Sequence, residues 1–294
     1  MENNDRIMKM LAYDGRVSII CANTTFLVEK ARKIHDLSPV ATAAFGRTLT
    51  VTALMAVNMK NESDKLTVQI KGNGPLGGMV IVSNNFPKLK GYVQNPIVDL
   101  PLKNDKLDVG GAIGQDGYLN IIKDIGLKDP YIGMVPLVSG EIAEDFASYF
   151  AKSEQTNTAV NLGVLVDANG VRKSGGYIVT PMPDATEEDL FILENRIREA
   201  KPLSQMLDEN MSLLDIAKDL TGDENVQVIE ENIMPLYECD CSKEKIERGL
   251  ISLGKEELQD IINTQVKIET VCHFCNKKYT FDKTELEKLL EQIK

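Results

Sequence analysis

Five cysteines occur in the 294-residue chain, and four of them lie in its last fifth. They form two pairs, Cys239-Asp-Cys241 and Cys272-His-Phe-Cys275, separated by thirty residues, whereas Cys21 stands alone. Thiolates are soft ligands, and two close pairs joined by a segment that can fold back can supply the four ligands of a closed tetrahedral zinc site. Thiols can also leave a metal and pair as disulfides, so the same residues predict a redox switch as well.

The zinc prediction has one unusual feature and one competing ligand. The first pair has a single intervening residue, whereas common zinc knuckles have about two to four. His273 lies between two of the cysteines, but four cysteines already complete a tetrahedral shell, so we do not expect this histidine to bind the metal. The alternative to a switch is a zinc ion that is purely structural and stays bound.

A metal bound by both pairs connects segments that are thirty residues apart in the sequence. Each pair is close enough to form a local disulfide once the metal has left, and two such small rings would leave the distant segments untethered. A structural zinc ion contributes roughly 10–16 kcal/mol to a small module. Because residues 239–294 are too few to form much of a core, we expect oxidation to unfold them.

The net charge of −11 lies in the segment just before the cysteines. Residues 183–238 carry 4 basic and 15 acidic side chains, whereas residues 1–182 carry 19 and 18 and residues 239–294 carry 10 and 11. No part has the basic excess of a nucleic-acid-binding surface. Like charges at this density oppose compaction.

The acidic segment nevertheless has apolar positions that need a surface to cover: Leu190, Leu193, Ile197, Leu213, Leu214 and Ile216. We expect this segment to cover apolar area on its neighbours when folded and to expose that area when released, and a large exposed apolar patch is typical of a binding site. An ordinary solvated pair of helices is the alternative interpretation.

Composition places the chain among globular proteins, with 43% hydrophobic and 26% charged residues, and its length fits two domains or one domain with an appendage. No run of about 18 apolar residues predicts a membrane span. The polar start contains no apolar signal region, so we expect a cytoplasmic protein, in which thiols stay reduced. Clustered cysteines in that compartment indicate a metal or redox centre.

The pattern of elements predicts an α+β fold. Strands are expected at residues 16–21, 65–71, 159–166, 171–180 and 265–270, with a hairpin turn at 167–170. Helices are expected at 39–59, 141–153, within 184–220, and at 242–253, 255–263 and 284–292. With a boundary at Pro181-Met-Pro183, we predict an N-terminal mixed sheet and helix core domain (1–182), an acidic helical linker (183–238) and a small C-terminal zinc-binding domain (239–294).

Three other candidate sites are weaker. Gly72-Asn-Gly74-Pro-Leu-Gly77 has the GxGxxG spacing, but a strand rather than a helix is expected next, so we interpret it as a glycine-rich turn and not as a dinucleotide site. Cys21 lies in an apolar run and is expected to be a buried core thiol. His35 has no catalytic partner nearby in the sequence and is expected to be a solvated residue at a helix end, with a partner elsewhere in the fold as the alternative.

The chain closely resembles the heat-shock protein 33 family, the redox-regulated holdase chaperones of bacteria, over almost its whole length. Five stretches carry the resemblance: Glu141–Gln155, Gly175–Val179, Pro183–Ala185, Cys239–Ser242 and Cys272–Tyr279. The paired Cys-x-Cys and Cys-x-x-Cys motifs at this separation are its most specific part.

The resemblance implies a function for the four cysteines. Cys239, Cys241, Cys272 and Cys275 would bind one Zn²⁺ in the reduced, inactive form. Peroxide, especially with heat, would release the zinc, form the disulfides Cys239–Cys241 and Cys272–Cys275, unfold the linker and favour a homodimer. The active form would hold unfolded or partly unfolded client proteins without ATP, so the protein is expected to be a chaperone and not an enzyme.

Two rival classes would behave differently. An interaction module with a structural zinc would keep its metal and its fold under peroxide. An oxidoreductase that uses Cys272 and Cys275 would turn over disulfide substrates, but the βαβ context of thioredoxin-like proteins is missing around them. Nucleic acid and membranes are not expected partners.

Overall fold

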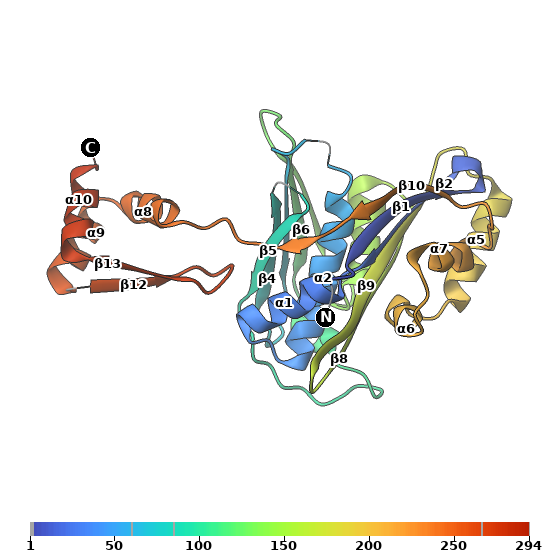
Figure 1. Cartoon of the computed structure of the whole chain (residues 1–294), viewed down its shortest axis with the longest axis horizontal. Coiled ribbons are helices and arrows are strands. Elements are labelled where there is room, and N and C mark those ends of the chain that lie inside the picture. Colours follow the sequence, from blue (N-terminus) through green and yellow to red (C-terminus); the bar gives the residue numbers. More distant parts are fainter. Residues whose placement is uncertain (1–2, 60, 85, 266, 294) are drawn as a thin grey trace. The chain divides into compact units, whose positions relative to one another are not determined.

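The computed structural model describes residues 3–59, 61–84, 86–265 and 267–293. The chain forms two compact units, Met1–Tyr237 and Glu238–Lys294 (Figure 1). The first unit contains two clusters of buried apolar side chains, and the second contains one of its own. Within the described ranges, no helix combines the length and the apolar character needed to cross a bilayer.

The first unit contains a five-stranded antiparallel sheet, here called sheet A. Its strands lie in the order β10-β1-β2-β9-β8, with β1 at Arg6–Ala12, β2 at Val17–Asn23, β8 at Ala159–Asp167, β9 at Gly170–Pro181 and β10 at Gln227–Ile233. A short 3-10 turn, Tyr13–Gly15, joins β1 to β2. Strands β8 and β9 form the hairpin that the sequence predicted.

Six strands form the second sheet, sheet B, in the order β11-β5-β4-β3-β6-β7. Their bounds are β3 Lys65–Lys71, β4 Gly78–Asn84, β5 Lys88–Val93, β6 Tyr118–Asp124, β7 Tyr131–Pro136 and β11 Leu236–Tyr237. All neighbours are antiparallel except β11, which pairs parallel to β5. The segment 72–77 joins β3 directly to β4, so its prediction as a glycine-rich turn is confirmed.

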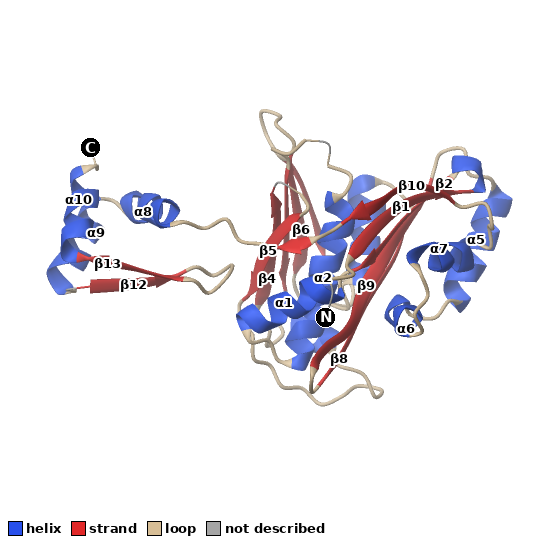
Figure 2. Cartoon of the chain, viewed as in Figure 1, coloured by secondary structure: helices blue, strands red, loops and turns tan. Residues whose placement is uncertain are grey.

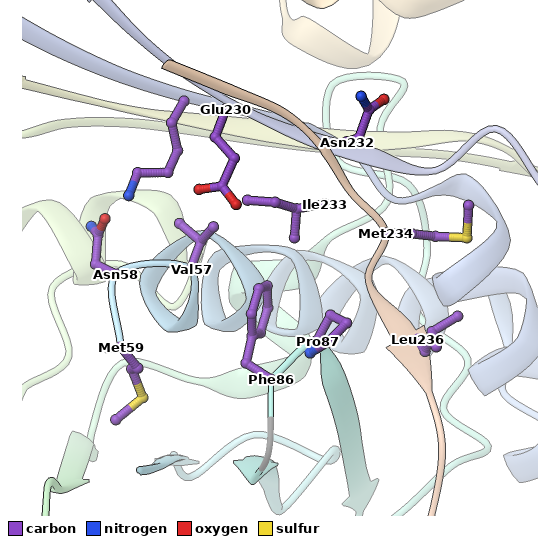
Figure 3. Close-up of a pocket in the computed structure, with 11 residues that line it drawn as sticks. Val57, Asn58, Met59, Phe86, Pro87, Glu230, Asn232, Ile233, Met234 and Leu236 are labelled. Atoms are coloured by element: carbon purple, nitrogen blue, oxygen red, sulfur yellow. The ribbon is translucent and has the colours of Figure 1, made fainter. Parts of the chain in front are cut away.

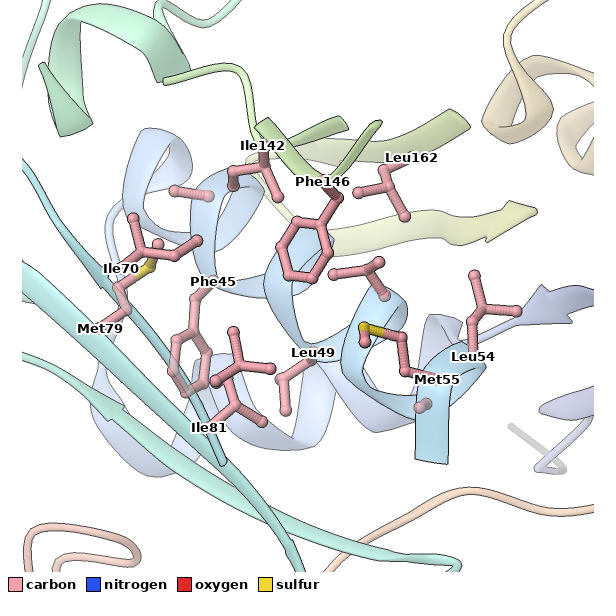
Figure 4. Close-up of a cluster of buried hydrophobic side chains, with 14 of the residues drawn as sticks. Phe45, Leu49, Leu54, Met55, Ile70, Met79, Ile81, Ile142, Phe146 and Leu162 are labelled. Carbon is pink, nitrogen blue, oxygen red and sulfur yellow. The ribbon is translucent and has the colours of Figure 1, made fainter. Parts of the chain in front are cut away.

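Helix α2 (Pro39–Ala56) packs against both sheets and forms the centre of the first unit (Figure 2). It begins with proline at its first position, as predicted, and 16 of its 18 residues are buried. Arg47 is its only charged residue, and a helix that is apolar all round is a buried helix. Phe45 lies in one cluster with Ile81 of sheet B and Leu162 of sheet A (Figure 4).

Three further helices complete this core: α1 (Thr25–His35), α3 (Val109–Ile113) and α4 (Ala143–Tyr149), which continues into a single π-helical turn at Phe150–Glu154. This segment overlaps the helix predicted over 141–153, and Ile142, Phe146, Tyr149 and Phe150 form a buried apolar stripe along it.

Three helices, here called the covering helices, pack on the face of sheet A that points away from α2 (Figure 2). They are α5 (Glu187–Glu199), α6 (Leu203–Asp208) and α7 (Leu213–Thr221), and the helical character predicted for residues 184–220 is confirmed. Thr186 starts α5 with a capping box, as its sequence predicted. Successive side chains along β2 point to opposite faces of sheet A, and both faces are buried. Cys21 packs with the covering helices, whereas its neighbour Ile20 belongs to the cluster around α2.

After the covering helices the chain becomes extended, which the sequence analysis did not anticipate. Strand β10 pairs with β1 in sheet A, and β11 pairs with β5 in sheet B. Residues 227–237, here called the crossover segment, therefore connect the two sheets of the first unit.

The second unit contains a hairpin and three helices. The helices are α8 (Lys243–Ser252), α9 (Lys255–Thr264) and α10 (Lys283–Glu291), and the hairpin is formed by β12 (Lys267–Val271) and β13 (Lys278–Asp282). All three predicted helices are confirmed. The predicted strand at 265–270 overlaps β12, although its residue Val266 lies outside the described residues. Leu250, Leu258, Phe281 and Leu286 fill the core of this unit.

Candidate metal centre

The second unit brings together the four cysteines that the sequence singled out. One Sγ atom from each of Cys239, Cys241, Cys272 and Cys275 lies within 4.8 Å of all the others. The sulfur atoms of Cys239 and Cys272 are 3.8 Å apart, and those of Cys241 and Cys275 are 3.4 Å apart. These two short contacts run between the pairs, so the cluster joins segments that are more than thirty residues apart. We call these residues the four-cysteine cluster.

Local backbone structure explains how each pair presents its sulfurs. Cys272 and Cys275 lie in the tight turn between β12 and β13, where the Cys272 amide donates to the Lys277 carbonyl (2.9 Å) and the Asn276 amide donates to the Cys272 carbonyl (2.8 Å). Asn276 adopts a left-handed conformation, with φ at +58°, which closes the turn. The other pair precedes α8, whose N-cap is Ser242.

The donor set fits a tetrahedral metal ion. A Zn–S bond of about 2.3 Å places the sulfurs of a tetrahedron about 3.8 Å apart. The sulfurs of Cys239 and Cys272 are 3.8 Å apart, and those of Cys241 and Cys275 are 3.4 Å apart. Cys272 is buried and the other three are half-buried against the apolar core of the unit. Four thiolates leave no open coordination position, so the arrangement is typical of a structural rather than a catalytic metal site.

The surroundings of Cys241 favour its thiolate, whereas those of Cys239 and Cys275 favour the thiol. Burial disfavours the thiolate of Cys241, but hydrogen bonds from Tyr279 and from the neighbouring thiols outweigh this effect and lower its pKa to about 7. The Tyr279 hydroxyl donates to this sulfur over 3.1 Å. Burial raises the pKa of Cys239 and of Cys275. Because the thiolate is both the metal ligand and the nucleophile, Cys241 is the most reactive of these three residues without a metal.

The remaining sequence candidates lie outside the cluster. His273 is exposed and is not part of the four-ligand group. Cys21 is fully buried beneath the covering helices, and burial raises its pKa to about 12, which confirms the prediction of a core thiol. The prediction of a solvated His35 is wrong: this side chain is only 7% exposed, and its Nε2 lies 2.7 Å from the hydroxyl of Tyr237.

Comparison with known proteins identifies the family. The model of the family described as Hsp33 protein matches residues 5–282. The chain belongs to the Hsp33 family. Hsp33 relatives include the 33 kDa chaperonin of Caldanaerobacter subterraneus subsp. tengcongensis, 48% identical over 98% of both chains, and that of Alkaliphilus metalliredigens, 44% identical over 99% of this chain and 100% of the relative.

A solved Hsp33 structure has the same fold. The crystal structure of the 33 kDa chaperonin from Thermotoga maritima superposes with a TM-score of 0.89, at 39% identity, and covers 98% of each chain. The Hsp33 family is one of chaperones and not of enzymes. The α+β fold and the family resemblance that the sequence predicted are therefore confirmed.

Proposed function

We propose that the chain is a redox-regulated, ATP-independent chaperone that holds unfolding proteins once its four-cysteine cluster is oxidised. The observation that carries this proposal is that the cluster joins two distant segments of a member of the Hsp33 family. The chain would be a cytoplasmic protein, because the reduced cluster requires a reducing compartment.

The reduced form would hold one zinc ion through Cys239, Cys241, Cys272 and Cys275. Bound zinc would keep the four thiolates deprotonated and cross-link the two segments. Tyr279 would support the site from outside, because its hydroxyl donates to the sulfur of Cys241. Among the described residues of the second unit, only nine side chains form its buried core, one of them Cys272, so this small core would depend on the cross-link.

Oxidation by peroxide would convert the cluster into two local disulfides, Cys239–Cys241 and Cys272–Cys275. Each disulfide would form as two thiolates give up two electrons, which together with two protons from solvent reduce one molecule of hydrogen peroxide to two of water. The sulfurs would then no longer be available to hold a zinc ion. In the folded cluster, sulfur contacts of 3.8 and 3.4 Å join one pair to the other. Local disulfides therefore replace bonds that tether the two segments with bonds that do not, and the second unit would unfold.

The surface that would bind clients is the face of sheet A beneath the covering helices. Met10, Ile19, Tyr177 and Val179 of the sheet are buried there against Leu207, Ile216 and Leu220 of the helices. Release of the helices would expose this apolar area, and an apolar area of this kind binds unfolded chains. Two exposed faces can also pair, which favours a homodimer of the oxidised form.

Polar contacts at the edges would hold the linker, residues 183–238, in the inactive form. Arg16 forms a two-pronged ion pair with Asp189 of α5, with nitrogen–oxygen distances of 2.7 and 3.2 Å. Arg172 of β9 pairs in the same way with Asp208 of α6. The segment's 15 acidic residues against 4 basic ones repel one another, and this repulsion would oppose these contacts and favour release of the linker.

The test couples metal release to client protection. A chromogenic chelator follows zinc during mild peroxide treatment at raised temperature, while light scattering follows the aggregation of a denatured client. We expect one equivalent of zinc to leave as client aggregation is suppressed. Full zinc loss without any gain in client protection would contradict the proposal, and retention of the metal under peroxide would support a purely structural site.

A further inference from the structure

The crossover segment, residues 227–237, is held in an unusual way. Strand β10 pairs with β1, where Ile7 lies opposite Ile233, and β11 pairs with β5, where Tyr237 lies opposite Leu89. Between these two pairings the segment passes over a pocket of about 940 Å³, which Val57 and Phe86 line from the core side (Figure 3). The segment is therefore fixed to two different sheets at its two ends.

Along most of this segment, side-chain burial contributes little to holding the chain on the first unit. From Gly222 to Met234 no residue is buried. Main-chain hydrogen bonds to β1 hold this part, and the pairing is interrupted by register shifts near Lys9. The next buried side chains are Pro235 and Tyr237, and Tyr237 is only 2% exposed. Tyr237 is therefore the principal side-chain anchor at the C-terminal end of the segment.

The hydroxyl of Tyr237 is fully engaged inside the core. It donates to the Gly91 carbonyl over 2.7 Å and accepts from the Gly91 amide over 3.2 Å. The same hydroxyl lies 2.7 Å from Nε2 of His35. Because a hydroxyl has one proton, all three contacts are satisfied together when His35 Nε2 carries its hydrogen and donates. The rings of His35 and Tyr237 also meet edge to face, with centroids 6.0 Å apart.

Only Glu238 separates this anchor from Cys239, the first residue of the four-cysteine cluster. While the cluster is closed, ordered chain continues on both sides of Tyr237. On the proposed function, opening of the cluster would unfold the residues from 238 onward, and the two-residue strand β11 would then be the last pairing of the first unit. Ordered structure frays from such ends, so loss of the linker would begin at this tyrosine.

We propose that Tyr237 is the residue through which the four-cysteine cluster controls the linker. The buried side chain of Tyr237 keeps the crossover segment, and α7 before it in the sequence, docked on the core until the residues from 238 onward unfold. The proposal rests on the proposed function, because it states an order of unfolding for the oxidised chain: first the second unit, then the crossover segment, then α7. It also predicts that loss of the Tyr237 side-chain contacts releases the crossover segment from the core even when the metal is bound.

Two variants, one that removes less and one that removes more of the Tyr237 side chain, test this role in the full-length, reduced, zinc-loaded chain. Tyr237→Phe removes the hydroxyl and leaves buried partners unsatisfied, whereas Tyr237→Ala also removes the ring. The readouts are hydrogen exchange of residues 227–237 and the zinc content of the same sample. Tyr149→Phe is the matched control, because Tyr149 is another fully buried tyrosine whose hydroxyl donates to Glu154 (2.8 Å), far along the chain from the crossover segment.

We expect exchange of residues 227–237 to become roughly 5- to 150-fold faster in Tyr237→Phe, and faster still in Tyr237→Ala, while one equivalent of zinc remains bound. Exchange of this segment in Tyr149→Phe should match the wild type. Unchanged exchange in both Tyr237 variants would overturn the proposal, and so would acceleration spread evenly over the whole first unit. Client protection by oxidised wild type, measured alongside, tests the proposed function separately, because a wild type that fails to protect leaves the exchange result unaffected.

Discussion

Ile216 offers the sharpest test of what the covering helices do. Its side chain is fully buried on α7, in the cluster between the covering helices and sheet A, and it does not belong to the cluster around α2. Shortening this side chain should therefore weaken the docking of the helices without weakening the core beneath sheet A. The account predicts a linker that opens in the reduced, metal-bound chain.

The expected increase in released helices depends on how many buried carbon atoms the substitution of Ile216 removes. An Ile→Ala change in a packed core costs about 2–5 kcal/mol, and Ile→Val costs about 0.5–1.5 kcal/mol. Since about 1.4 kcal/mol is a factor of ten, Ile216→Ala should raise the fraction of chains with released helices roughly 30-fold to several thousand-fold. Ile216→Val should raise that fraction only about 2- to 12-fold.

Cys21 provides the readout, because it is fully buried in the same cluster. Alkylation under native conditions, followed by mass spectrometry of peptides, reports Cys21 separately from the four cluster cysteines. The control is Ile81→Ala, the same change at a fully buried position in the cluster around α2. We expect fast alkylation of Cys21 in Ile216→Ala, intermediate alkylation in Ile216→Val and slow alkylation in the control. Equal rates in Ile216→Ala and wild type would refute the reasoning, as would equal rates in the two alanine variants.

Three further predictions follow from single residues. Cys272→Ser removes one of four thiolates, so residues 239–294 should be cleaved faster by protease even when reduced in a zinc buffer; cleavage at the wild-type rate would count against the metal site. Arg16→Ala removes the partner of the buried Asp189, so hydrogen exchange in α5 should rise more than exchange in α7, and the opposite order would contradict an anchoring role. Hydrogen bonds from Arg32 lower the pKa of Glu29 from 4.5 to about 2, so the stability that its carboxylate contributes is present above pH 4.5 and is lost as pH falls toward 2. In acid titrations, the difference in free energy of unfolding between wild type and Glu29→Gln should therefore shrink across this range. A difference that stays constant would contradict a stabilising role of the Glu29 carboxylate.

Signals that lie close together in the sequence predicted the structure well. Thr186 is followed three residues later by Asp189, and it starts α5 with a capping box in the structure. The two cysteine pairs likewise carry their chemistry within a few residues. Their meeting across thirty residues was predictable because four soft ligands have few other uses in a reducing compartment.

The error over His35 has a different origin. The residue follows a basic stretch at the end of a helix, which is typical of an exposed position, but its hydroxyl partner lies 202 residues away on Tyr237. Neither residue has a distinctive local pattern, and the contact exists only because β11 adds to sheet B. Long-range polar contacts of this kind become visible only once the sheet order is known.

Strand β10 was missed because it lacks the usual signal of a strand. Six of its seven side chains are exposed, so no alternation of polar and apolar residues marks it in the sequence. It is held by the main-chain edge of β1, and main-chain pairing has no side-chain signature. Because few of its side chains are buried, main-chain hydrogen bonds to β1 are what hold this strand.

The central claim is that oxidation replaces a bridge between distant segments with two bonds that cannot bridge them. Disulfide mapping by mass spectrometry of the peroxide-treated, client-protecting chain tests this claim most directly. The account predicts Cys239–Cys241 and Cys272–Cys275 as the bonds found. Active material with bonds Cys239–Cys272 and Cys241–Cys275, between sulfurs that lie 3.8 and 3.4 Å apart in the folded cluster, would keep the segments joined and would contradict it.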